Sequence, residues 1–173
     1  MQIEIEPVKN NEVQILSDIS SRCFYDTFYK HNTAEDMELF LEKSFNINVL
    51  QQEIIHAHNY FFFCKSGSEI MGYIKLSDAE VPEKLKEFDA LEIARIYVVK
   101  EKIGWGIGKS LMDFAFSFAR QMKKPVTWLG VWEHNSHAIS FYRKYGFEKF
   151  DEQIFMVGND AQTDWLMKKE VTA

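Results

Sequence analysis

Residues 91–109 read LEIARIYVVKEKIGWGIGK, a run in which a strand, a turn and the start of a helix follow one another. The first nine residues, Leu91 to Val99, are mostly apolar and β-branched, which predicts a strand. Glycines at 104, 106 and 108 predict a turn, and apolar residues from Ile107 to Met122 recur at helical spacing. A glycine-rich turn that opens a helix exposes free N–H groups at the positive end of the helix dipole. The stretch therefore predicts an anion-binding site.

The spacing of the glycines excludes two common anion-binding motifs. A Walker A loop needs a glycine five residues before the glycine of Gly-Lys-Ser at 108–110, and that position holds Ile103. A dinucleotide fingerprint needs a third glycine, but its last position holds a lysine when counted from Gly104 and a leucine when counted from Gly106. The anion is therefore neither an NTP on a Walker A loop nor a dinucleotide on a Rossmann turn.

The rest of the chain predicts an alternation of helices and strands. The polar stretch from Asp78 to Asp89 contains Pro82 and predicts a loop with room for one helical turn. The other predicted segments are a strand at 2–8, helices beginning near Val13 and at Thr33, a helix at 49–57, a hairpin of 60–65 and 69–77, a helix to 123, a strand at 126–131, a helix at 138–145, and a closing hairpin of 147–157 and 163–169. This order indicates a mixed α/β fold in one domain, residues 1–173.

Composition limits the partners and the compartment. Of 173 residues, 46% are hydrophobic and 27% are charged, as in a globular protein. The net charge of −6 repels phosphate backbones, so we expect no nucleic-acid partner and an attraction for cations. No apolar run approaches the ~20 residues that cross a bilayer, and Met1 to Glu6 is acidic, unlike an export signal. Two cysteines are too few for a disulfide framework, and together these features predict a cytoplasmic protein without a membrane partner.

A second motif lies downstream of the glycine turn, in residues 131–147, which read VWEHNSHAISFYRKYGF. This segment resembles the Asn-x-x-Ala-x-x-Phe-Tyr-x-Lys-x-Gly-Phe motif of the GNAT acetyltransferase superfamily. Gly106 and Gly108 match the family's Gln/Arg-x-x-Gly-x-Gly/Ala signature, although Ile103 departs from the usual Gln or Arg. The resemblance implies a central, mostly antiparallel twisted sheet flanked by helices, with an acetyl-CoA site after the fourth strand. It also implies acetyl-CoA as co-substrate and no metal.

The resemblance implies which residues bind acetyl-CoA. Strand backbone would contact the pantetheine arm, and amides from Gly104 to Ser110 would hold the pyrophosphate, unless the glycines only form a tight turn. Asn135 would approach pantetheine, and it can also cap the following helix. The implied cofactor-binding residues are Ile96, Tyr97, Val98, Gly104, Trp105, Gly106, Ile107, Gly108, Lys109, Ser110, Asn135 and Tyr142.

Tyr142 matches the general acid of the family. Expelling CoA leaves a thiolate of pKa ~8.5, which a nearby tyrosine can protonate if the geometry helps. The alternative is a core aromatic on a short amphipathic helix. Neither cysteine has a histidine that the sequence pairs with it, so we expect direct attack of the acceptor on the thioester. His134 and His137, with Glu133, lie in a loop without a nearby cysteine or further ligand, so we expect no metal.

Glu92 is the candidate general base. An amine of pKa ~10.4 is almost fully protonated at pH 7, so a group must accept its proton, directly or through water. Alternation along the strand puts Glu92 on one face with Ala94, Ile96 and Val98. The alternative role is a solvated carboxylate or an ion-pair partner.

Three segments are most similar to PaiA-type acetyltransferases: the strand residues 94–98 (ARIYV), the Val-Trp-Glu-x-Asn segment at 131–135, and residues 24–28 (FYDTF). Those enzymes are associated with spermidine and spermine. Acidic residues in the early helices would favour such polycations, namely Asp26, Glu35, Asp36, Glu38 and Glu42. Two alternatives stay open: a protein or peptide N-acetyltransferase of the same fold, and a regulatory protein that binds acetyl-CoA without turnover. The family also includes homodimers.

Overall fold

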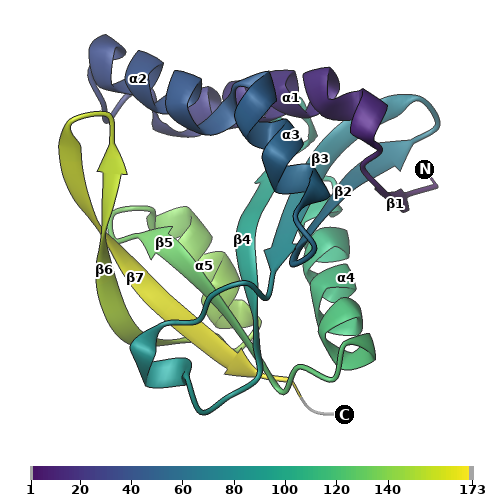
Figure 1. Cartoon of the computed structure of the whole chain (residues 1–173), viewed down its shortest axis with the longest axis vertical. Helices are drawn as coiled ribbons and strands as arrows, with labels where there is room; N and C mark the ends of the chain where they lie inside the picture. The colour runs from purple at the N-terminus through teal and green to yellow at the C-terminus, as the bar shows by residue number, and fades with distance from the viewer. Residues whose placement is uncertain (1, 172–173) are drawn as a thin grey trace.

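The computed structural model describes residues 2–171, which form one seven-stranded sheet with the order β1-β2-β3-β4-β5-β7-β6 (Figure 1). Every neighbouring pair of strands is antiparallel except β4 and β5. The strands are β1 (Glu4–Pro7), β2 (Asn59–Ser66), β3 (Glu69–Ser77), β4 (Ala90–Val98), β5 (Val126–Trp132), β6 (Glu148–Val157) and β7 (Asp160–Glu170); the α-helices are α1 (Val13–Phe28), α2 (Ala34–Phe45), α3 (Ile47–Ile55), α4 (Ile107–Gln121) and α5 (Ser136–Lys144). The predicted mixed α/β class with a mostly antiparallel sheet is confirmed.

Capping residues set where several helices begin. The Thr33 hydroxyl accepts from the Asp36 amide, so α2 starts where the sequence predicts. The Asn46 side chain accepts from the Val49 amide, which starts α3 two residues earlier than its apolar pattern indicates. The predicted turn inside the 78–89 loop is a short 3₁₀ helix, η2 (Glu83–Leu85). No helix between residues 2 and 171 is long and apolar enough to cross a membrane.

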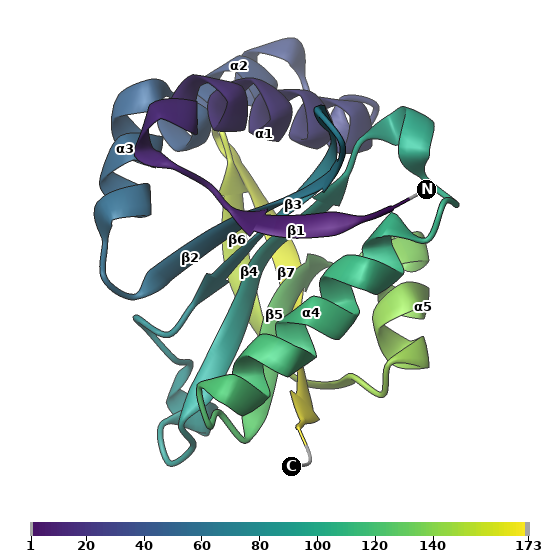
Figure 2. The same ribbon diagram turned by 90° about the vertical axis from the view of Figure 1, so that its right-hand side faces the viewer.

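Helices cover both faces of the sheet (Figures 1 and 2). On one face α4 and α5 pack through a core that includes Leu111, Phe116 and Ile139. On the other face α1, α2 and α3 pack through a second core, to which Leu16 and Phe40 belong. The strands between them therefore carry two sets of inward-facing side chains.

The sheet splits between β4 and β5. These parallel strands pair only where Ala90–Glu92 meet Val126–Trp128, and beyond that point they diverge (Figure 1). The residues of β5 that follow pair with β7 instead, up to Trp132 opposite Asp164. The split leaves the upper half of β4 with a free edge, because backbone groups on that side have no neighbouring strand.

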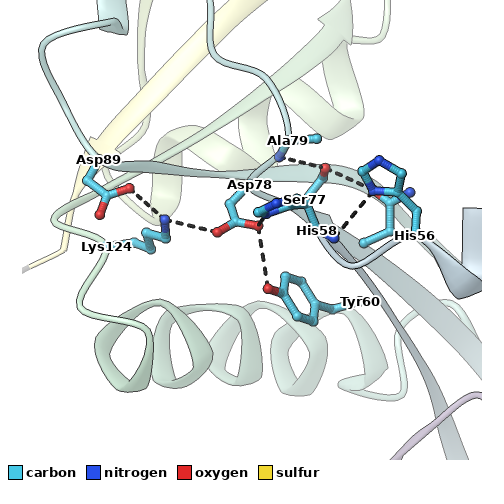
Figure 3. Close-up of polar contacts among 9 residues, drawn as sticks. His56, His58, Tyr60, Ser77, Asp78, Ala79, Asp89 and Lys124 are labelled. Atoms are coloured by element: carbon cyan, nitrogen blue, oxygen red, sulfur yellow. Dashed lines mark hydrogen bonds and ion pairs between the residues drawn. The ribbon is translucent and has the colours of Figure 1, made fainter.

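A polar network holds the closed end of this split (Figure 3). Lys124, just before β5, forms ion pairs with Asp78 at 3.0 Å and with Asp89, which precedes β4. The His58 Nδ1 lies 3.0 Å from the same Asp78 carboxylate, and the Tyr60 hydroxyl lies 3.4 Å away. Burial alone would raise the pKa of Asp78, but the hydrogen bonds from Lys124 and His58 outweigh burial and lower it. The network therefore joins the segment before β5 to the segments that follow β3 and precede β4.

The tip of the β6–β7 hairpin docks on the start of α2. The Asn159 amide donates to Asp36 Oδ1 at 2.8 Å, and the Gln162 side chain donates to Asn32 at 2.7 Å. The turn contains only two residues, Gly158 and Asn159, so β7 begins at Asp160, three residues before its predicted start. This contact fixes the tip of the β6–β7 hairpin against the start of α2.

Gly158→Ala tests that docking. Gly158 has φ +59°, and a Cβ there would lie 2.5 Å from Asp36 Cα, whereas Gly67, in the β2–β3 turn, has φ +58° and nothing within 4 Å. Both Ala variants lose about 1 kcal/mol for the left-handed conformation, but Gly158→Ala should lose about 3 kcal/mol in total because the hairpin must also move. Urea unfolding of both variants measures the difference, and equal losses would mean that the tip does not depend on α2.

Candidate active site

A cavity of about 570 Å³ occupies the split between β4 and β5. Its walls come from both faces of the sheet, because α1 lines one side and the α4 and α5 region lines the other. The lining residues are Phe24, Thr27 and Phe28 of α1; Ile93 to Val98 of β4; Ile103, Gly104, Gly106, Gly108 and Lys109; Gly130 to Trp132 of β5; Asn135, His137, Ala138, Phe141 and Tyr142; and Phe155, Val157, Gln162 and Asp164 of the hairpin. The cavity therefore passes through the sheet and connects the two helical layers.

The glycine turn has the backbone of an anion cradle. Gly104 and Gly106 have φ +89° and +83°, and an added Cβ at either would meet no atom within 4 Å, so the space in front of the loop is open. The first helical bond of α4 runs from the Ser110 amide to the Gly106 carbonyl at 3.0 Å. The amides of 107–109 therefore have no partner within the helix. The loop suits the pyrophosphate of acetyl-CoA.

Two amides of the predicted cradle are already engaged. The Trp105 amide donates to the Lys102 carbonyl at 3.2 Å, and the Ser110 amide closes the first turn of α4. The Trp105 ring is exposed, with Lys102 Nζ 4.6 Å from its centroid. Lys109 forms an ion pair with Asp113, and this contact raises the pKa of Lys109. Lys102 pairs with Glu69 at 2.9 Å, so both lysines near the loop already have a carboxylate partner.

The free edge of β4 and the start of α5 face each other across the cavity. The Val99 amide donates to the Met71 carbonyl of β3 at 2.9 Å, so by alternation the peptide groups of Val98 and Ile96 point toward the split. Asn135 Oδ1 accepts from the Ala138 amide at 3.2 Å and caps α5, while the same residue lines the cavity. The capping role and a role beside pantetheine are therefore compatible.

Tyr142 lies on α5 and lines the cavity, with only 8% of its surface exposed. Its ring packs against Phe141 and Phe147, so it also contributes to the core beneath α4. Burial raises the pKa of the phenol, which keeps the hydroxyl protonated at neutral pH. The structure therefore places Tyr142 both in the core and at the cavity wall, and its role as a general acid stays a prediction.

The predicted orientation of Glu92 is wrong because β4 contains a bulge. Pairing with β3 passes from Leu76↔Ile93 to Lys75↔Arg95, so Ala94 is an extra residue. Ile93 packs toward α4, as Ile96 and Val98 do. Glu92 therefore points to the opposite face, toward α1–α3, together with Arg95.

The environment of Glu92 suits a proton acceptor. It is the last β4 residue paired with β5, opposite Trp128, directly below the residues that line the cavity, although its own side chain is not part of the lining. Burial raises the pKa of Glu92 to about 7, while Lys75 and Arg95 act in the other direction. Both cations bind Glu53, at 2.8 and 2.7 Å, which limits their effect on Glu92.

Asp164 is a cavity residue that sequence reasoning missed. It lies on β7 opposite Trp132, is 8% exposed, and burial raises the pKa of its carboxyl to about 6. Within residues 2–171 no hydrogen bond or ion pair involves its side chain. The only sequence signal is a carboxylate beside Trp165 and Leu166 in a predicted strand, and this does not reveal that the position faces a cavity.

The acidic residues of the early helices do not form the predicted rim. Asp26 pairs with Arg22, and Asp36 is used for capping and for docking the hairpin. Glu38 and Glu42 border a separate shallow hollow beside Tyr25. None of the five predicted acidic residues, which also include Glu35, lines the cavity.

The two cysteines and the possible metal ligands are the candidates for a nucleophile site and a metal site. Cys23 and Cys64 are free and buried, and burial raises the pKa of these thiols to about 12 and about 11. Buried thiols of this kind are poor nucleophiles. Among the described residues there is no group of three or more potential metal ligands.

The cavity therefore has free amides that suit an anionic donor on one side of the sheet and a buried carboxylate on the other. The model of the acetyltransferase (GNAT) family matches residues 14–147, and the chain belongs to this family. It is an acetyl-CoA-dependent N-acetyltransferase. An uncharacterized N-acetyltransferase in the pepI 3′ region of Lactobacillus delbrueckii subsp. lactis is 41% identical over 167 residues, 96% of each chain.

Solved structures show the same fold. The PaiA N-acetyltransferase of Thermoplasma acidophilum, crystallised with coenzyme A, has a TM-score of 0.80 and 22% identity, over 98% of this chain and 99% of that one. The ribosomal-protein-S18-alanine N-acetyltransferase of Escherichia coli has a TM-score of 0.73 and 13% identity, over 99% and 96%. Only the second of these enzymes is named for its acceptor, and a shared fold alone does not select the acceptor.

Gly106→Leu tests the cradle. A side chain at this position would fill the open space in front of the free amides, so CoA affinity should fall at least ~10-fold, measured by calorimetry. Gly67→Leu places the same side chain at another glycine of positive φ, in a distant turn, and should bind CoA normally. Unchanged affinity in Gly106→Leu would rule out the loop as the pyrophosphate site.

Proposed function

We propose that this enzyme transfers the acetyl group of acetyl-CoA directly to a primary amine, with a polyamine such as spermidine or spermine as the acceptor. The observation that carries the proposal is the cavity through the sheet, which joins the glycine loop to the face where Glu92 and Asp164 lie. An acyl donor on one face and an amine on the other can then meet in the split. Direct attack is also favoured because neither buried cysteine lines the cavity.

In this proposal the glycine loop and the β4 edge bind the donor. The free amides of Gly106 to Lys109 hold the pyrophosphate, and the peptide groups of Ile96 and Val98 bind the pantetheine arm as an added strand would be bound. Asn135 and Tyr142 border the reacting end. These residues orient the thioester in the split and shield it from water.

The proton steps use two groups on opposite faces. Glu92, whose pKa of about 7 makes it half ionised at neutral pH, takes one proton from the ammonium through water. The amine nitrogen then bonds to the acetyl carbon, the carbon–sulfur bond breaks, and its electron pair goes to sulfur. Tyr142 donates its hydroxyl proton to that sulfur and regains one from the nitrogen. The products are the N-acetylated amine, CoA thiol and one proton released from Glu92.

The acceptor is proposed on chemical grounds and on the likeness to a PaiA enzyme. A net charge of −6 attracts polycations, and Asp164 supplies a carboxylate inside the cavity. The fold is shared with an enzyme named for a ribosomal protein, so a protein or peptide amine is the second candidate. We also propose that residues 1–173 act as one domain in the cytoplasm, in keeping with two free cysteines.

Tyr142→Phe separates an enzyme from a protein that only binds acetyl-CoA. Loss of the hydroxyl should lower kcat roughly 100-fold and leave CoA affinity within about twofold, since only the proton donor is lost. Tyr145→Phe, at the C-cap of the same helix and outside the cavity lining, is the matched control and should keep its kcat. A full rate in Tyr142→Phe would require another acid.

Glu92→Gln tests the base through a pH profile. Only ionised Glu92 accepts a proton, so kcat/KM of the parent should rise with pH and level off above its pKa of about 7. The Gln variant should lose this ionisation and, at pH 8, roughly 100-fold in kcat/KM. A variant that keeps the same ionisation would exclude Glu92 as the base.

The same variant should be more stable than the parent at high pH. Folding raises the pKa of Glu92 from 4.5 to about 7. The contribution of this group to the free energy of unfolding is therefore fully present below pH 4.5 and is lost as pH rises through 7. At pH 8 Glu92→Gln should therefore gain about 1–3 kcal/mol in urea unfolding, with no gain at pH 4. Exposed Glu87→Gln is the control and should show no such difference.

A further inference from the structure

The cavity is lined by three side chains that are mainly ionised at neutral pH: Arg95, Lys109 and Asp164. Arg95 forms two hydrogen bonds to Glu53, at 2.7 and 3.0 Å, and Lys109 pairs with Asp113. Within residues 2–171, Asp164 has neither a hydrogen bond nor an ion pair for its carboxylate. The acceptor side of the cavity therefore presents one uncompensated negative charge.

The sheet holds this carboxylate against open space. Trp165 packs on the face of the sheet that α4 and α5 cover, with Arg143 of α5 over its ring, so alternation turns Asp164 to the face of α1. There its Oδ2 lies 3.4 Å from where a Cβ of Gly130 would be, and Gln153 Nε2 lies at the same distance. Gly130 and Asp164 both line the cavity, so the carboxylate lies at the cavity wall beside a residue that has no side chain.

Aromatic rings surround the same part of the cavity. Phe28 and Trp132 meet edge to face with centroids 6.2 Å apart, and Phe155 enters from the hairpin. Ammonium groups bind favourably over aromatic faces, and more strongly where water is excluded. A buried carboxylate without a partner is costly, whereas a bound cation would offset that cost. Rings and carboxylate together suit an alkylammonium group.

Asp164 lies too far from Glu92 for both to contact one ammonium. Glu92 pairs with Trp128 of β5, and Asp164 pairs with Trp132, four residues further along the same strand. At ~3.3 Å per residue the two levels are ~13 Å apart. A group bound at Asp164 is therefore separate from the amine whose proton Glu92 accepts.

We propose that Asp164 binds a second ammonium group of the acceptor and so makes this enzyme select diamines and polyamines over monoamines. The inference rests on the proposed transfer to an amine, and it assigns the specificity to one carboxylate at the β5–β7 edge of the cavity. The family match ends at residue 147, so Asp164 on β7 lies beyond the matched segment.

Asp164→Asn tests the assignment, because it removes the charge and keeps the shape. For spermidine and 1,4-diaminobutane, kcat/KM should fall at least ~10-fold, mainly through KM, since a charged contact remote from the reacting bond is lost. For butylamine, which lacks the second ammonium, it should stay within about twofold. Glu170→Gln lies on the same strand outside the cavity and also removes one negative charge. It should leave kcat/KM unchanged for the diamines and for butylamine.

An equal fall for butylamine and the diamines, or no fall for either, would overturn the proposal. Melting curves check that the variants fold, and Asp164→Ser repeats the test if the Asn variant does not. Calorimetric binding of spermidine to CoA-loaded protein gives a readout that needs no turnover. If the parent acetylates no amine, the proposed function fails, while spermidine affinity in the Asp164 variants still decides whether this carboxylate binds the cation.

Discussion

The site depends on the short pairing between β4 and β5. Two parallel strands that stayed paired would bury their edges in a continuous sheet and leave no route between the helical layers. Here three residue pairs hold them together at one end, where Lys124 joins Asp78 to Asp89. Beyond this clamp the free edge of β4, the glycine loop and α5 border a space that opens on both faces. Donor and acceptor chemistry can therefore be kept on separate sides of one sheet.

Burial of charge is the cost of this arrangement. Glu92 and Asp164 both have a raised pKa because they lie in or beside the cavity, and neither has the close ion partner that Glu53 has. Ionised carboxylates without partners reduce stability above neutral pH. An enzyme tolerates this where the groups serve a ligand, since active sites often exchange stability for function. Glu53, held by Lys75 and Arg95, is the structural counterpart on the same face.

Local patterns predicted much of the fold and of the donor side. The glycine spacing, the apolar face of α4 and the Asn135 segment are short-range signals, and each corresponds to an element in the structure. The orientation of Glu92 was not predictable in this way, because a bulge at Ala94 depends on how β3 pairs with β4. The contact of Asp36 with the β6–β7 hairpin was not predictable for a related reason, because its partner Asn159 is 123 residues away in the sequence. Asp164 faces the cavity only because the sheet splits, and no local signal predicts a split.

The most direct test of the account is release of CoA thiol from acetyl-CoA by the unaltered protein with a panel of spermidine, spermine, amino acids and short peptides. The account predicts saturable release with the polyamines and little with amino acids. Release only with peptides would keep the fold and the donor site but contradict the acceptor. Binding of acetyl-CoA without release to any amine would contradict the proposed transfer itself.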